Sequence, residues 1–198
     1  MKQKLLTFLL LIACVGNAWG IRYSVDTTAG TAAVVSSSAS YSYADEQPYS
    51  GDVVIPQEIV YKGVTYPVTS IGNDTFYKCY SLTSITIPEA VTSIGSGAFD
   101  GCFRLTSITI PEGVTSIGGR AFKGCSSLTS INIPEGVTSI GENTFYGCSG
   151  LTSITIPEGV ASIGRSAFFD CSGLTSITIP EGVTSIGDGA FEYCIYEA

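Results

Sequence analysis

Histidine is absent from this chain of 198 residues. Because histidine is the commonest general base and a frequent metal ligand, its absence removes the usual partner of a catalytic serine or cysteine. Charged side chains are also scarce, at 13% of the chain, and 17 acidic residues outnumber 9 basic ones. Nucleic-acid binding requires clustered lysine and arginine, so this balance argues against it. We therefore expect a non-catalytic protein without a cofactor, a metal or a nucleic-acid partner.

The N-terminal segment 1–20 is typical of a secretory signal peptide. Lys2 and Lys4 precede an apolar run over 5–12, and small residues at Ala18 and Gly20 suit signal peptidase. The run is too short to span a membrane. Cleavage after Gly20 leaves 7 basic and 17 acidic residues, a net charge of −10. The mature protein is then secreted or held at the cell surface.

A second interpretation of the same segment rests on Leu11-Ile12-Ala13-Cys14, which resembles a lipobox. Lipidation of Cys14 would make a lipid anchor the protein's only contact with a membrane. An uncleaved, buried helix is the third alternative. Both main interpretations export the protein.

Residues 21–54 do not repeat, and we assign them to an N-terminal β cap of two or three strands. Turns are expected at 29–30 and 50–51, where glycine occurs. The segment 57–67 is an insertion relative to the later repeats. We expect a small hairpin there, turning at Lys62-Gly63, and loops of this kind sometimes carry the binding site.

From Val68 a unit of 23 residues recurs without gaps. A period of this length predicts a solenoid, which we place over 55–198. In the unit that starts at Leu105, Ile108 and Ile110 are two residues apart and share one face of a strand. Pro111 ends the strand because it lacks a backbone donor. Neighbouring strands should form one continuous parallel sheet.

The second half of each unit is expected to bend the chain back. Gly118 is interpreted as a sharp bend that exploits the freedom of glycine. The Ala121-Phe122-x-Gly-Cys segment is predicted to form one short helical or 3₁₀ turn with Phe122 in the interior. The last coil is incomplete after Cys194 and lacks its sheet strand, so this edge is expected to be open.

The unit Leu-Thr-Ser-Ile-Thr-Ile-Pro-Glu-Gly-Val-Thr-Ser-Ile-Gly-x-x-Ala-Phe-x-Gly-Cys-Ser resembles the BspA-type leucine-rich repeat over Val68 to Cys194. The resemblance implies a β-rich leucine-rich repeat solenoid on a cell surface, with a parallel sheet on one face. It further implies adhesion through host or matrix proteins, and it implies no catalytic residues.

Three sets of residues recur at equivalent positions of successive repeats, here called columns, and each has a simple structural explanation. Six cysteines recur at one position, and we favour a buried thiol ladder over a disulfide framework. Five glutamates recur after proline, as solvated turn residues or, alternatively, a weak Ca²⁺ ridge. Paired Ser and Thr columns are interpreted as hydroxyl groups that hydrate an exposed sheet. Ice binding is the alternative, because repetitive ice-binding surfaces carry similar columns.

Positions that differ between repeats are free to recognise a partner, unless they only reflect drift on a tolerant surface. Aromatic residues and arginine dominate binding hot spots. The candidate partner-binding residues are Tyr77, Tyr80, Phe103, Arg104, Arg120, Lys123, Tyr146, Arg165 and Phe169. Lys78, Asp100, Asp170 and Tyr193 vary as well.

These observations favour an exported, adhesin-like solenoid that binds an extracellular protein or glycan. The alternative is a structural module that associates with itself end to end.

Overall fold

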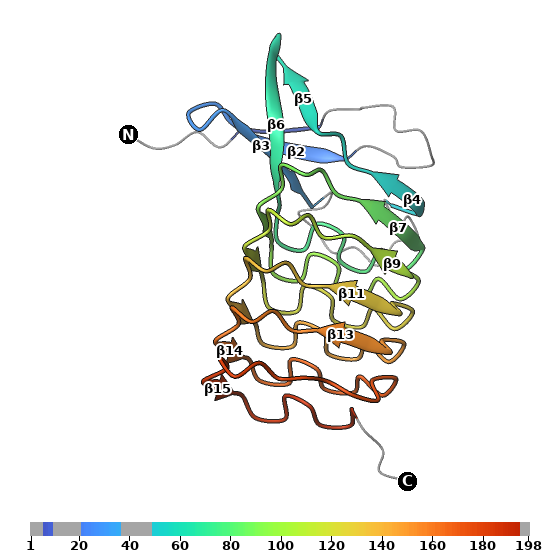
Figure 1. The fold of residues 1–198 in the computed structure, drawn as a ribbon. Coiled ribbons are helices and arrows are strands. Elements are labelled where there is room, and N and C mark those ends of the chain that lie inside the picture. Colours follow the sequence, from blue (N-terminus) through green and yellow to red (C-terminus); the bar gives the residue numbers. More distant parts are fainter. Residues whose placement is uncertain (1–5, 10–20, 37–48, 195–198) are drawn as a thin grey trace.

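The computed structural model describes residues 6–9, 21–36 and 49–194. The predicted cleavage site after Gly20 and the lipidation candidate Cys14 lie outside these residues. The described chain forms a β solenoid with a small cap at its N-terminal end (Figure 1).

The cap is built from three antiparallel strands: β1 (Leu6–Leu9), β2 (Arg22–Asp26) and β3 (Thr31–Val35). Between β2 and β3 the chain turns where the sequence predicts it. There the Asp26 carboxylate accepts hydrogen bonds from the backbone amides of Thr28 and Ala29, at 2.9 and 3.0 Å. Strand β3 then pairs in parallel with β6 (Val64–Ile71), which joins the cap to the repeats.

The predicted hairpin is present in the insertion. Strand β5 (Glu58–Tyr61) pairs antiparallel with the first half of β6, and Tyr61 lies opposite Val64. Lys62 and Gly63 have φ values of 50° and 78°, as a two-residue type I′ turn requires. The hairpin projects beyond the cap end of the solenoid (Figure 1).

The repeats form two parallel ladders, where the sequence predicts one sheet. The first ladder follows β4 (Gly51–Val54), β7 (Leu82–Thr86), β9 (Ser107–Ile108), β11 (Ser130–Asn132) and β13 (Ser153–Thr155) (Figure 1). The second follows β6, β8 (Ser93–Ile94), β10 (Ser116–Ile117), β12 (Ser139–Ile140), β14 (Ser162–Ile163) and β15 (Ser185–Ile186). The second extended piece of each repeat therefore lies beside its own equivalents. Strand pairing is interrupted once in each ladder, between β9 and β11 and between β10 and β12. Strand β4, within the range that the sequence assigns to the cap, pairs with β7 in the first ladder.

A stack of aromatic rings fills the interior. The six repeat phenylalanines lie nearly parallel, with ring centroids 5.2–5.5 Å apart and planes within 11°. Tyr49 closes the stack at the cap end, with its ring edge-on to Phe76 at 5.0 Å. Each ring is covered by the rings of the neighbouring coils, so the core is continuous along the axis.

The cysteine ladder lies beside the rings. All six repeat cysteines are buried, free thiols. Five of them place Sγ 2.7–3.3 Å from the carbonyl oxygen of the phenylalanine 26 residues earlier. Burial raises the pKa of Cys79 and of Cys148 to about 12. The thiols therefore act as small apolar groups with a weak donor.

The Ala-Phe-x-Gly-Cys segment is a run of hydrogen-bonded turns that does not extend into a regular helix or 3₁₀ helix. Several of its amides donate to the next coil: Phe99 N to Ala121 O and Gly101 N to Lys123 O, both at 2.7 Å. Others close turns over three residues, such as Cys102 N to Phe99 O at 3.1 Å. Because these bonds to neighbouring coils use the donors, the backbone does not continue into a helix.

Gly118 has a different role from the predicted one. Its φ is not among the left-handed values, so the bend does not need glycine's freedom. A Cβ on Gly118 would instead overlap the backbone nitrogen of Ser96 in the preceding coil. The Ile-Gly step is therefore a close approach between two backbones.

Candidate binding face

The bending half of each repeat forms a third side of the solenoid, which we call the turn face. It comprises residues 73–81, 96–104, 119–127, 142–150, 165–173 and 188–194. Hydrogen bonds between adjacent coils hold it along its length, for example Arg120 N to Glu142 O at 2.9 Å. Side chains on this face therefore have fixed spacing along the axis.

All nine candidate partner-binding residues lie on the turn face, and the structure brings most of them into contact. Tyr80 and Phe103 stack with centroids 5.0 Å apart and planes 9° apart. A Cβ added at Gly101 or Gly124 would only touch these rings, 3.7 Å from Tyr80 and 3.5 Å from Phe103, so the left-handed backbone, with φ at 80° and 70°, is what favours glycine there. Phe103 is 49% exposed. The next residue in its column is Ser126, so one face of the Phe103 ring has no aromatic neighbour from the following repeat.

A second aromatic row spans three later coils of the turn face. Tyr146 stacks on Phe169 at 4.8 Å, and Phe169 meets the ring of Tyr193 edge-on at 5.1 Å. The ammonium of Lys123 lies 5.1 Å from the Tyr146 ring centroid, a cation–π contact. Lys123 thereby links this second row to the coil 119–127, which directly follows the coil of Phe103.

Arg120 and Asp100 form the single ion pair among the described residues, with Nη2 and Oδ2 2.6 Å apart. The Asp100 side chain is 10% exposed and that of Arg120 is 50% exposed. The hydrogen bond from the guanidinium to Asp100 raises the pKa of Arg120 above its ordinary value. The pair neutralises a buried carboxylate, and the outer part of the guanidinium stays in solvent.

The remaining candidates are more isolated. Tyr77 contacts the ammonium of its neighbour Lys78, 5.1 Å from the ring centroid. Arg104 and Arg165 are exposed and form no ion pair within the described part of the chain. The turn face carries five of the seven basic residues that follow the predicted leader. An acidic protein thus concentrates its cations on one side.

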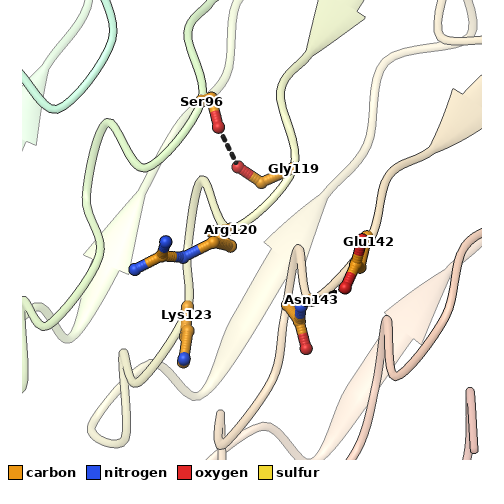
Figure 2. A pocket seen from close by; sticks show the side chains of 6 residues that line it. All are labelled: Ser96, Gly119, Arg120, Lys123, Glu142 and Asn143. Carbon is orange, nitrogen blue, oxygen red and sulfur yellow. Dashed lines mark hydrogen bonds between the residues drawn. The ribbon is translucent and has the colours of Figure 1, made fainter.

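A shallow hollow of about 400 Å³ opens on the turn face (Figure 2). It is lined by Ser96, Gly119, Arg120, Lys123, Glu142 and Asn143. Arg120 and Lys123 form one side, and Glu142 and Asn143 of the next coil form the other (Figure 2). Sequence reasoning missed the other four residues. For Ser96, Gly119 and Glu142 the signal was the variable position after Ile-Gly, which holds Asn73, Ser96, Gly119, Glu142, Arg165 and Asp188 in successive repeats, and Asn143 lies at the next variable position.

The two ladders carry polar columns outward, as predicted for the Ser and Thr residues. The strand serines of the first ladder are exposed or half-buried, and the isoleucines beside them are buried. At the cap end Asp52 continues the serine column and accepts hydrogen bonds from Ser84 Oγ and Thr83 Oγ1, at 2.6 and 3.0 Å. These bonds lower the pKa of Asp52. The ladders are therefore regular, whereas the turn face differs from coil to coil.

The described residues contain no group of three or more His, Cys, Asp or Glu side chains placed to hold a metal ion. Among them no helix has the length and apolar character needed to cross a membrane.

Comparison with known proteins supports the repeat assignment. Residues 69–197 match the BspA type leucine rich repeat region in six copies. A leucine rich cell surface protein from Faecalibacterium prausnitzii A2-165 is 31% identical with a TM-score of 0.63, over 92% of this chain and 52% of its own. The chain thus spans about half of that protein. No functionally curated protein matches the chain at a significant level.

Two other crystal structures are similar. A leucine-rich repeat protein from T. pallidum is 27% identical with a TM-score of 0.67, over 89% of this chain and 88% of its own. One from Bacteroides capillosus is 29% identical with a TM-score of 0.56, over 72% of this chain and 95% of its own.

Proposed function

Since the chain belongs to the BspA-type leucine-rich repeat family, we propose that it is an exported, non-catalytic protein that binds an extracellular protein or glycan. The observation that carries this proposal is the difference in sequence variation between the faces of the solenoid. The ladders and the core are fixed by repetition, and the residues that vary form contacting aromatic and cationic rows on the turn face. The similarity to a leucine rich cell surface protein supports a location at the cell surface or outside the cell.

The binding site that we propose is centred on Phe103, Arg104 and Lys123. Phe103 presents an exposed ring held from behind by Tyr80. Arg104 is its neighbour in the chain, and Lys123 precedes Gly124, over which the Phe103 ring lies. An exposed aromatic ring on a face that also carries these two cations suits a partner that combines a flat apolar group with negative charge.

The binding test compares the exported protein with a variant in which Phe103→Ser and Arg104→Ser copy the following repeat, Cys125-Ser126-Ser127. Both are applied to immobilised extracellular-matrix proteins and to a glycan array. We expect at least one interaction that the variant loses. The control Asn132→Thr restores the repeat consensus on the first ladder and should retain binding. Equal binding by all three proteins would contradict the assignment to the turn face.

The export test is the intact mass of the protein made by its native host. A mass that begins at Ile21 identifies free release, and a lipid-sized addition on Cys14 identifies a membrane-held form. A mass that retains residues 1–20 contradicts both forms of export.

End-to-end self-association is the second candidate, and it has its own structural support. Ile179 and Ile186, at the C-terminal end of the described solenoid, are 40% and 50% exposed. Their equivalents one coil earlier, Ile156 and Ile163, are 4% and 1% exposed. Replacing both exposed isoleucines by threonine should abolish concentration-dependent assembly if this end is the contact. Assembly that survives the double replacement would rule this end out.

A further inference from the structure

The seven-stranded sheet that joins the cap to the second ladder ends in the order β1-β2-β3. Strand β2 is held by β3 on one side and by β1 on the other, with Leu6 opposite Val25 and Leu9 opposite Arg22. Strand β1 lies within the segment 1–20 that the sequence marks as a leader. Cleavage after Gly20 removes β1, and processing before Cys14 removes it as well.

Removal of β1 leaves β2 as the edge of the sheet. Its backbone N–H and C=O groups on that side then lack partners, while β3 keeps the strand extended through five paired residues. An edge of this kind readily pairs with a strand from another chain. The pairing with β1 shows that the edge accepts an antiparallel strand. Figure 1 shows β2 at the cap end of the solenoid, away from the C-terminal coils.

We infer that the β2 edges of two mature copies pair antiparallel, and the inference rests on the proposed export. The sequence of β2, Arg-Tyr-Ser-Val-Asp, is complementary to itself in this orientation. With Ser24 opposite Ser24, each Tyr23 faces a Val25 and each Arg22 faces an Asp26. Opposite charges and aromatic–β-branched pairs are favourable cross-strand neighbours. The arrangement is a closed twofold contact.

Other registers lose these pairs. A parallel arrangement places Arg22 beside Arg22 and Asp26 beside Asp26, which repel. A shift of two residues places Arg22 opposite Ser24 and leaves its charge unmatched. The Asp26 carboxylate is already oriented by the amides of Thr28 and Ala29. A mature N-terminus at Ile21 would add a second positive charge next to Arg22, near the partner's Asp26.

The contact has a consequence for timing, because the leader occupies the edge in the uncleaved chain. A precursor that retains β1 should stay monomeric, and pairing should begin only after processing. Two solenoids joined at their caps would extend in opposite directions from the joint and present two turn faces.

The test is sedimentation velocity over a range of concentrations, using exported protein whose start at Ile21 is verified by intact mass. We expect a monomer–dimer equilibrium for the wild type. Arg22→Asp and Asp26→Arg should each weaken the dimer by about tenfold, because each creates two like-charge pairs. The double variant Arg22→Asp with Asp26→Arg restores both pairs and should dimerise like the wild type.

A matched charge control is Arg165→Asp on the turn face, which should leave the dimer unchanged. Circular dichroism of every variant verifies folding. A start at Ile21 with a monomer at all concentrations would overturn this inference and leave the export proposal standing. A dimer that the single charge reversals do not weaken would also overturn it. Retention of residues 1–20 would overturn the export proposal and, with it, this inference.

Discussion

The guanidinium of Arg120 lies 2.6 Å from the carboxylate of Asp100, although the two residues belong to different coils. Arg120 makes this contact from a left-handed backbone, with φ at 61°. Glycine occupies the same column at Gly97 and Gly189, with φ values of 62° and 63°. Arg120 therefore makes the ion pair from a position where glycine would fit the left-handed backbone with less strain.

This relationship predicts a sign change in a double-mutant cycle. Arg120→Gly relieves the backbone but leaves the Asp100 carboxylate buried without a partner, so we expect a loss of about 1 kcal/mol in unfolding free energy. In an Asp100→Asn background the same change should be neutral or stabilising, by up to about 1 kcal/mol. Urea unfolding of the four proteins measures both values. An equal effect in both backgrounds would mean that the pair is uncoupled.

The close approach at the Ile-Gly step predicts a contrast between two glycines. Gly118→Ala forces a Cβ into the backbone of Ser96, and we expect a loss of about 1–3 kcal/mol in stability. Gly113→Ala meets no atom closer than 3.6 Å, and Ala90 already occupies that column in another repeat. It should be neutral or stabilise by about 0.5 kcal/mol. Thermal and urea unfolding measure the stability of both variants. An equal loss of stability in the two would mean that the close contact with the Ser96 backbone is unimportant.

The ring stack predicts that position along the axis sets the cost of truncation. Phe122 is fully buried between two rings, whereas Phe191 stacks on one ring and is half-buried. Phe122→Ala should cost about 3–5 kcal/mol. Phe191→Ala should cost clearly less, because solvent already reaches that ring. A larger loss for Phe191→Ala in urea unfolding would contradict this explanation.

The cysteine ladder predicts a loss of stability in alkali. Burial raises the pKa of Cys148 from 9.0 to about 12, so the folded state favours the neutral thiol. The contribution is complete below pH 9, where the thiol is protonated in both states. Above that pH the unfolded state loses the proton first, so unfolding free energy should fall by about 1.4 kcal/mol per pH unit for this thiol.

Urea unfolding between pH 7 and pH 10 checks this slope, with Cys148→Ala as the comparison. The variant loses packing at every pH, so only the change with pH is compared, and its curve should be flatter above pH 9. Parallel curves would show that Cys148 does not titrate in this way. At neutral pH, six alkylated cysteines after denaturation without reductant would verify the free thiols.

Sequence periodicity sufficed for the parts of the fold that every repeat shares. Ile108 follows from its place in the repeat, and the turn at Lys62-Gly63 follows from local backbone preferences. The second ladder was missed because a two-residue strand such as β10 has too short a pattern to indicate its pairing. The role of Gly118 was misinterpreted because a close contact between coils and a sharp bend both select glycine, so the sequence alone does not distinguish them.

The candidate site was only partly predictable for a related reason. Variation between repeats identified both residues: Phe103 breaks the Gly-Cys-Ser pattern, and Arg120 occupies a position that has no fixed residue type. It could not show that Arg120 reaches Asp100, because that contact depends on side-chain direction. Ser96 and Glu142, which line the hollow, are ordinary surface residues until the coils are stacked.

The constant register between coils also affects how the protein can gain or lose whole repeats during evolution. Ser84 pairs with Ser107, and Ser130 with Ser153, each pair one repeat of 23 residues apart. Unequal crossing-over between near-identical repeats in the DNA would insert or delete whole coils without disturbing either end of the protein. Such an event would shift the distance between the Phe103 and Tyr146 rows by one coil, about 4.8 Å. Variants with different numbers of coils would therefore differ in the spacing of their contact residues, with the residues themselves unchanged.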